Sequence, residues 1–149
     1  MKKIASLLLL ISMIGIGATA QTTKLPALNK KKFTAEVWDF KKSKKFNYLG
    51  GSKAIVIDFN AVWCKPCKEI HPLLLELQAE YGDQITIYGI DVDKEPDITD
   101  AFKITNIPAL VFIRDNKTPY FLSVGKKSKE ELKALIEEHC FGRKPKAVQ

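Results

Sequence analysis

In the middle of the chain, a run of hydrophobic residues typical of a strand is followed by hydrophobic residues at helical spacing. Residues 53–59 are apolar and β-branched apart from a first lysine and one aspartate, which is typical of a buried strand. Beyond them, apolar residues recur at helical spacing and define one face of an amphipathic helix: Ile70, Leu73, Leu74 and Leu77. The pattern therefore predicts a buried strand that leads into a helix.

Similar signals continue to the end of the chain. They predict a strand at 85–92, a short helix at 98–102, and a hairpin of strands at 109–113 and 120–124. A closing helix follows, with Ser128 as its cap and Glu131 at the capping-box position. Strands that alternate with helices, followed by a hairpin and a helix, predict an α/β fold with three layers.

The segment before the central strand is weakly patterned. Residues 21–32 are polar, and we expect them to form a flexible lead. Val37, Trp38 and Phe40 are expected to pack as a first helix with Thr34 as its cap, although nearby lysines dilute the pattern.

The junction between the central strand and its helix carries the chemistry. The run Trp63-Cys64-Lys65-Pro66-Cys67 places two thiols where they can close and reopen a disulfide. The positive end of the helix dipole stabilises the Cys64 thiolate, which is the form that attacks a disulfide. Cys67 lies one turn further in and is expected to be less exposed. These positions predict that Cys64 attacks and that Cys67 resolves the mixed disulfide.

These residues resemble the thioredoxin family. The resemblance covers about residues 53–139 and rests on residues 56–59, the Trp-Cys-Lys-Pro-Cys run and Ile107-Pro108, together with Pro72 and Gly125. A Cys-X-X-Cys run alone is also found in zinc sites, but its preceding aspartate and distant Ile-Pro make the match specific. The resemblance implies a thioredoxin fold with a central mixed β-sheet flanked by helices. It also implies a protein-disulfide oxidoreductase whose Cys64–Cys67 disulfide is redox-active and which needs no cofactor.

The resemblance assigns a role to Asp58. The corresponding aspartate of the family is buried beneath the active site, where desolvation raises its pKa and lets it shuttle protons near neutral pH. Asp58 would then deprotonate Cys67, directly or through a water. The alternative is a local capping or hydrogen-bonding role, although a charge in an apolar strand is costly without a function.

Five residues are candidates for contact with substrate: Trp63, Lys65, Pro66, Ile107 and Pro108. Pro108 corresponds to the family's cis-proline, which lies opposite the cysteines and leaves the backbone of Ile107 free to pair with an extended substrate. An ordinary trans proline that enters the next strand is the alternative. Pro66 restrains the turn between the cysteines without the loss of a needed hydrogen bond. Trp63 either shields the dithiol and offers apolar surface to a partner, or is a core residue.

Three positions depart from the family. Lys65 replaces the usual glycine; its ammonium favours the Cys64 thiolate and makes the pair more oxidising, unless it is a solvated charge that contacts only acidic partners. Asn60 stands where the family commonly has an aromatic residue, and Gly89 where it has a lysine near the buried aspartate. Without that cation, we expect desolvation to raise the pKa of Asp58 further.

The first twenty residues have the features of a secretory signal peptide. Met1-Lys2-Lys3 precedes an apolar stretch at 4–16 and the small-residue run Ala18-Thr19-Ala20, so we expect cleavage after Ala20. An uncleaved membrane anchor is the alternative. These features predict export, most simply to a periplasm, with residues 21–149 as a single domain and no stable membrane insertion after cleavage.

Composition and charge fit this picture. The chain has 149 residues, 46% of them hydrophobic, which is enough for one core without disulfide stapling. Loss of Lys2 and Lys3 lowers the formal net charge from +7 to +5. Lysines cluster at 30–32, 41–45 and 126–129, but no interleaved aromatics accompany them, so nucleic acid is not an expected partner.

The remaining cysteine and a nearby histidine leave alternatives open. Cys140 is either a packed small hydrophobe or, as an odd thiol in an exported protein, a site for an intermolecular disulfide. Cys64, Cys67 and His71 lie on consecutive turns, so an exported copper or zinc carrier is an alternative function. A redox-silent binding scaffold is another. We favour a reductase of protein disulfides that depends on an unidentified redox partner for electrons.

Overall fold

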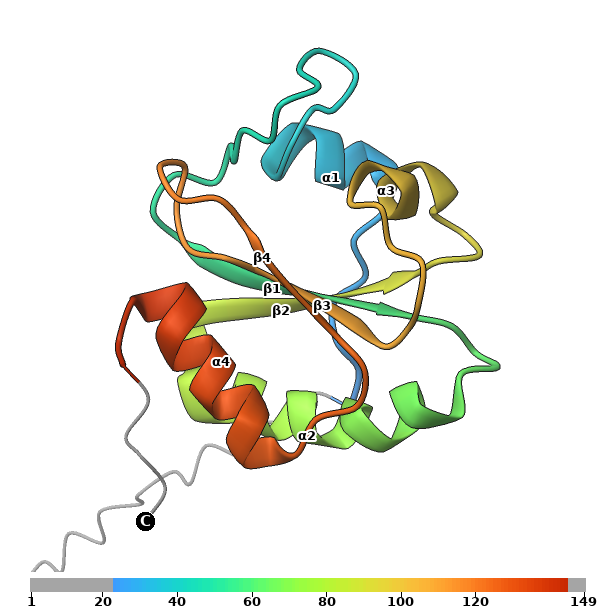
Figure 1. The fold of residues 1–149 in the computed structure, drawn as a ribbon, viewed down its shortest axis with the longest axis vertical. Helices are drawn as coiled ribbons and strands as arrows, with labels where there is room; N and C mark the ends of the chain where they lie inside the picture. Colours follow the sequence, from blue (N-terminus) through green and yellow to red (C-terminus); the bar gives the residue numbers. More distant parts are fainter. Residues whose placement is uncertain (1–22, 145–149) are drawn as a thin grey trace, which may run out of the picture.

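The computed structural model describes residues 23–144, and Figure 1 shows their arrangement. The predicted signal peptide and its cleavage site after Ala20 lie outside the described residues.

A four-stranded mixed sheet forms the middle layer. Its strand order is β2-β1-β3-β4, with β1 (Ala54–Asn60) parallel to β2 (Ile85–Asp91). β3 (Ala109–Ile113) runs antiparallel to β1 and to β4 (Phe121–Val124). The predicted strands are confirmed to within about one residue at each end, and so is the mixed sheet.

Helices cover both faces of this sheet, as Figure 1 shows. α2 (Lys65–Tyr81) and α4 (Lys129–Phe141) lie on one face, and α1 (Lys30–Glu36) and α3 (Pro96–Ala101) lie on the other. A short 3-10 helix, η1 (Gly82–Gln84), joins α2 to β2. The three-layer α/β fold predicted from the sequence is therefore confirmed.

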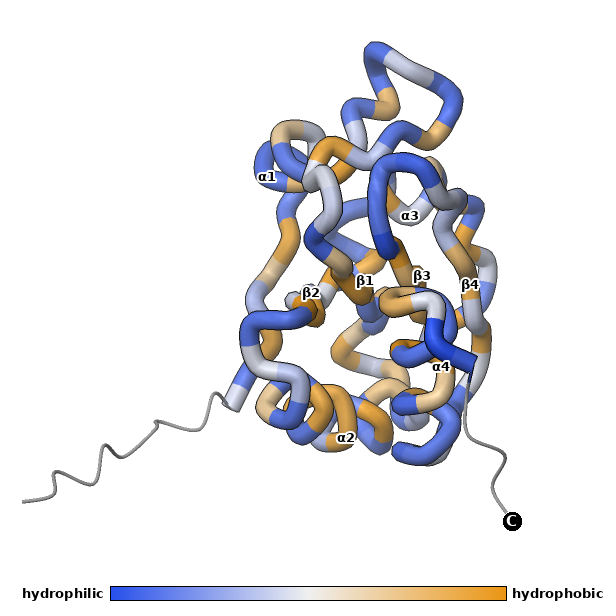
Figure 2. The backbone as a smooth tube through the Cα atoms, turned by 90° about the vertical axis from the view of Figure 1, so that its left-hand side faces the viewer, coloured by the Kyte–Doolittle hydropathy of each residue, from blue (hydrophilic) through white to orange (hydrophobic). Residues whose placement is uncertain are grey.

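The alternation of side chains along β1 divides the core into two clusters. Val56 packs with Leu74 of α2, whereas Ile57 packs with Phe33 of α1 on the opposite face. Figure 2 shows the hydrophobic strands between the two layers of helices. Asp58 shares the face of Val56 and lies two residues further along β1, so its side chain belongs to the α2 side of the sheet.

The closing helix begins and packs as the sequence predicts. Ser128 Oγ accepts from the Glu131 backbone N–H at 3.2 Å, and the Glu131 carboxylate accepts from the Ser128 N–H at 2.7 Å. Cys140, near the end of α4, is a buried free thiol within the core. The packed role expected for Cys140 is confirmed.

The N-terminal segment differs from the sequence expectation. α1 begins at Lys30 rather than after Thr34, because the Asn29 side chain caps it by accepting from the Lys32 N–H at 2.9 Å. Thr34 lies inside the helix and donates its hydroxyl to the Lys30 carbonyl. The sequence pattern predicts that Trp38 lies within this helix. In the structure, Trp38 lies after the end of α1, and its side chain is buried.

The described part of the expected flexible lead is packed onto the sheet. Leu25 and Leu28 are buried in the two core clusters. Backbone hydrogen bonds join Gly89 of β2 to Pro26 at 3.0 Å and to Leu28 at 3.1 Å. The prediction missed this because two isolated leucines carry no periodic signal, and the open edge of β2 supplies their partner.

No helix within residues 23–144 is long and apolar enough to cross a membrane.

Candidate dithiol–disulfide site

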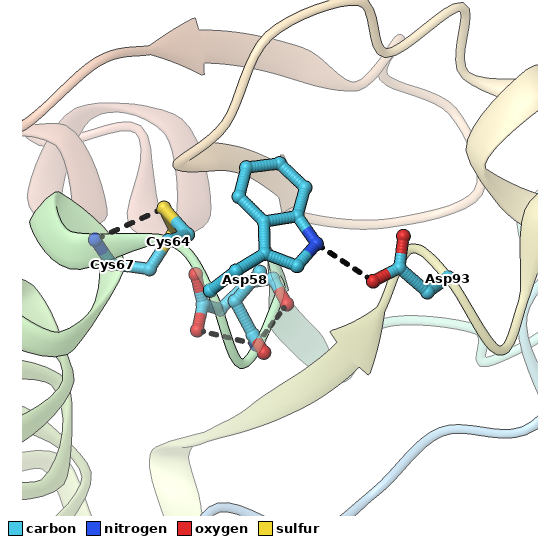
Figure 3. Close-up of a disulfide and its surroundings, with 6 residues drawn as sticks. Asp58, Cys64, Cys67 and Asp93 are labelled. Atoms are coloured by element: carbon cyan, nitrogen blue, oxygen red, sulfur yellow. Dashed lines mark hydrogen bonds between the residues drawn. A yellow bond between two sulfur atoms is a disulfide. The ribbon is translucent and has the colours of Figure 1, made fainter.

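The cysteine pair lies where β1 passes into α2, shown in Figure 3. Cys64 is the N-cap of α2, and its Sγ accepts from the Cys67 backbone N–H at 3.3 Å. The two residues form a disulfide, with their Cα atoms 5.3 Å apart. Pro66 lies in the first turn, where its missing N–H leaves no hydrogen bond unmade. The sulfur of Cys64 therefore lies at the N-terminus of a helix, as the sequence predicted.

The two cysteines are equally buried, contrary to expectation. Both are 3% exposed. Ala61 packs with the pair, and the partly buried Val92 and Ile107 lie against this cluster. Helix position alone does not reveal these neighbours, which come from the segment after β2 and the loop before β3. In the oxidised protein, helix position distinguishes the two sulfur atoms of the disulfide, whereas burial does not.

Asp58 is a buried carboxylate on the same side of the sheet as α2. It is 1% exposed, and its Oδ1 has no hydrogen-bond partner among the described residues. Burial raises the pKa of Asp58 to about 7, and a hydrogen bond from the Asn60 side chain opposes this shift. Gly89 pairs with Asp58 in the β1–β2 register, so no side chain projects from that neighbouring strand position. The raised pKa expected from the sequence is confirmed in direction.

The loop before β3 meets the cysteine pair. The Ile107–Pro108 peptide bond is cis, as the family resemblance implied, and Ile107 packs against the cysteines. The Pro108 carbonyl accepts from the Gly125 N–H at 2.8 Å. Gly125 has φ +91°, a conformation that favours glycine and lets the end of β4 turn toward this loop.

Trp63 lies on the surface rather than in the core. Its side chain is 65% exposed, and its indole Nε1 donates to the Asp93 carboxylate at 2.8 Å (Figure 3). The neighbouring Val62 is also exposed. The core alternative for Trp63 is therefore wrong, and these residues form an exposed apolar patch beside the disulfide.

Asp93 is a site residue that the sequence analysis missed. It follows β2, whereas Trp63 follows β1, and the two strands are parallel. Since parallel strands end at the same edge of a sheet, the residues just beyond them can meet. The topology, once predicted, was the signal that could have identified Asp93.

The lysine and histidine candidates lie on α2. Lys65 is exposed in the first turn, and His71 is half-exposed further along the helix. Across the part of the chain that the structure describes, no three or more His, Cys, Asp or Glu side chains are grouped to hold a metal ion. The Cys64, Cys67 and His71 set proposed from sequence is therefore not such a group.

The geometry of the site defines a class of protein. A disulfide at a helix N-terminus, packed against Ile107 of an Ile–cis-Pro loop and on the same side of the sheet as the buried Asp58 carboxyl group, is suited to dithiol–disulfide exchange.

Comparison with known proteins identifies the family. Residues 26–138 match the thioredoxin family model. Thioredoxin from Borreliella burgdorferi is 34% identical over 112 residues, which is 75% of this chain and 94% of that protein. Thioredoxin from Bacillus subtilis is 40% identical over 85 residues, covering 57% and 81% of the two chains. The chain therefore belongs to the thioredoxin family and is a protein-disulfide oxidoreductase.

A solved structure shows the same fold. Chloroplastic thioredoxin z superposes with a TM-score of 0.62 at 19% identity, over 78% of this chain and 95% of that one. Members of the family act on protein disulfides, receive electrons from a reductase partner and need no cofactor beyond their cysteine pair.

Proposed function

We propose that this protein is an exported reductase of protein disulfides. The observation that carries the proposal is the Cys64–Cys67 pair at the N-terminus of α2, held in a thioredoxin fold.

The reaction starts from the reduced dithiol. The Cys64 thiolate attacks one sulfur of a substrate disulfide, whose S–S bond breaks and releases the first substrate thiolate, which takes a proton from solvent. Cys67 gives its proton to the Asp58 carboxylate, directly or through a water, and attacks Cys64 Sγ. The second substrate sulfur then leaves as a thiolate and is protonated, while Asp58 releases its proton. Two electrons pass to the substrate, and the product is the Cys64–Cys67 disulfide present in this structure.

The N-terminus of α2 and the buried Asp58 carboxylate each activate a different cysteine. The free backbone N–H groups at the start of α2 stabilise a thiolate on Cys64. Asp58, with a pKa near 7, can both accept and release a proton at neutral pH. The resolving thiol needs such a base because only its thiolate is a nucleophile.

Substrate contacts are assigned to the rim of the site. Trp63 offers exposed apolar surface, and Ile107 presents its backbone beside Pro108 to an extended substrate segment. Lys65 and Pro66 lie between the cysteines, where Lys65 adds a positive charge next to Cys64. The expected partners are folded or partly folded proteins with accessible disulfides.

The equilibrium reduction potential of the mature protein tests the direction. The Cys140→Ala variant is used as well, so that only the Cys64–Cys67 pair exchanges with the redox buffer. A value near about −270 mV supports a reductase, whereas one near about −120 mV would make the protein a disulfide donor. A Cys67→Ser variant should trap mixed disulfides through Cys64, and a Cys64,Cys67→Ser double variant is its control.

Export is tested separately. The N-terminus has a basic start, an apolar stretch and a small-residue site. These features support removal of residues 1–20 and a periplasmic location. Protein recovered from the exported fraction of an expressing bacterium should begin at Gln21. A chain that keeps Met1 and stays in the cytoplasm contradicts this part of the proposal.

A further inference from the structure

We propose that Asn60 is a positioning residue that holds the Asp58 carboxylate and stabilises its charged form in place of a cationic partner. The inference deepens the proposed function, because it rests on Asp58 as the proton acceptor for Cys67.

The contact between the two side chains is direct. Asn60 Nδ2 donates to Asp58 Oδ2 at 3.0 Å and to the Asp58 backbone carbonyl at 3.2 Å. Both partners accept, so the amide must present its NH₂ group to them, and each of its two hydrogens has one acceptor. The side chain of Asn60 thereby fixes the carboxylate against the strand from which both residues come.

This contact distinguishes the two carboxylate oxygens. Oδ2 accepts from Asn60, whereas Oδ1 is buried and has no partner among the described residues. A bond to the amide lowers the proton affinity of Oδ2, because the Asn60 donor competes for its lone pairs. Oδ1 is therefore the oxygen that receives the proton from Cys67.

The neighbouring strand leaves room for this arrangement. Gly89 lies opposite Asp58, and a Cβ added there would lie 3.7 Å from Asn60 Nδ2 and 3.8 Å from Leu25 Cβ. A Cβ would therefore fit there in ordinary van der Waals contact, but glycine projects no side chain from β2. Asn60 reaches Asp58 along its own strand instead.

No charged group takes over the role of Asn60. β2 contributes Gly89 opposite Asp58, and β3 contributes the apolar Leu110. At this end of α2, the charged side chains of Lys65, Lys68 and Glu69 are exposed, and Cys67 is closed in the disulfide. The segment before α1 brings Leu25 to this side. Burial and the Asn60 hydrogen bond are accordingly the only two influences on the pKa of Asp58 among the described residues.

The experiment measures the ionisation of Asp58 directly. Carbon-13 NMR of its carboxyl group follows the titration in the oxidised protein, where the cysteines do not titrate. The Asn60→Leu variant removes the donor and keeps the volume, so Asp58 should bind its proton about tenfold more tightly. Asn60→Ala is the second variant, in case leucine is not accommodated. Asn116→Leu, an exposed position in the β3–β4 turn, is the matched control and should leave the titration unchanged. An unchanged or lowered pKa of Asp58 in folded Asn60 variants overturns the inference.

Kinetic measurements distinguish this inference from the proposed proton transfer between Cys67 and Asp58 on which it rests. In the Asn60 variants, the pH midpoint of protein-disulfide reduction should rise together with the pKa of Asp58. A midpoint that stays in place while the pKa moves refutes the positioning role. If Asp58→Asn leaves the pH profile of the parent protein unchanged, the relay itself fails, whatever the NMR titration of the Asn60 variants shows.

Discussion

Trp63 and Asp93 are thirty residues apart in sequence and are joined by a hydrogen bond of 2.8 Å between the indole nitrogen and the carboxylate. The bond links the residue before Cys64 to the segment that follows β2. It holds an exposed indole in one orientation beside the disulfide, although the side chain has little packing to fix it. The apolar patch at the site is thus oriented by a polar contact.

Replacement of Asp93 by alanine should release the indole and weaken recognition of protein substrates. A single exposed hydrogen bond to a charged group contributes about 1 kcal/mol, so we expect the KM for a protein disulfide to rise about fivefold with kcat nearly unchanged. Fluorescence anisotropy of Trp63 should fall in the same variant, measured with Trp38 replaced by phenylalanine. Asp83→Ala, at an exposed position in η1, is the control. Unaltered anisotropy and KM in Asp93→Ala would show that the bond does not orient the indole.

The burial of Asp58 should make the oxidised protein less stable as the pH rises. The pKa of Asp58 is about 7 in the folded protein, whereas that of an exposed aspartate is 3.8, so between these values the folded state binds the proton more tightly. The free energy of unfolding therefore falls as pH rises through this window. At higher pH, the folded protein buries a charged carboxylate, which remains destabilising. From pH 5 to pH 8, the contribution of Asp58 to the free energy of unfolding should fall by about 2–3 kcal/mol.

Urea unfolding of the oxidised protein at the two pH values measures this loss. Asp58→Asn has no group to ionise there, so the difference between the parent and this variant isolates Asp58 from the other carboxylates. The free energy of unfolding of the variant minus that of the parent should be larger at pH 8 than at pH 5. An equal difference at both pH values would mean that Asp58 titrates as an ordinary exposed carboxyl.

The sequence predicts the sheet and the reactive cysteines because both have short-range signals. The apolar, β-branched run at 53–59 and the helical spacing beyond Cys67 depend only on neighbours in the chain. The capping box at Ser128 is likewise a local motif, and the structure shows it complete. The family match adds the Ile107–Pro108 cis bond, which no local pattern distinguishes from trans.

The remaining features depend on contacts between distant segments. Leu25 and Leu28 are buried because they meet the open edge of β2 and the clusters beside it, so the described part of the lead is packed, although its composition suggests flexibility. The equal burial of the cysteines comes from contacts with Val92, which follows β2, and Ile107, which precedes β3. The sequence shows Asn60 only as a departure from the family's usual aromatic residue, because its hydrogen bond to Asp58 depends on the positions of both side chains.

Loss of the Ser128 side chain should destabilise the protein at the start of α4. Ser128→Ala removes the acceptor for the Glu131 N–H and leaves that first-turn group without its cap. Substitution of such a cap costs about 1 kcal/mol, which urea unfolding at constant pH resolves as a lower midpoint with an unchanged slope. Ser52→Ala, at an exposed turn position, is the matched control and should leave the midpoint in place. Equal midpoints for the two variants would show that the capping box contributes nothing to global stability.

Cys140 should remain inert while the protein is folded. Its thiol is 2% exposed, and burial raises its pKa to about 12, so almost none of it is the reactive thiolate at neutral pH. The oxidised protein should therefore react with Ellman's reagent at least about a hundredfold more slowly than its unfolded form, because reaction requires the core around α4 to open. The unfolded, oxidised chain should release one equivalent, and the Cys140→Ala variant none. Rapid labelling of the native protein, or a Cys140-dependent covalent dimer on a non-reducing gel, would show that this thiol is available to partners after all.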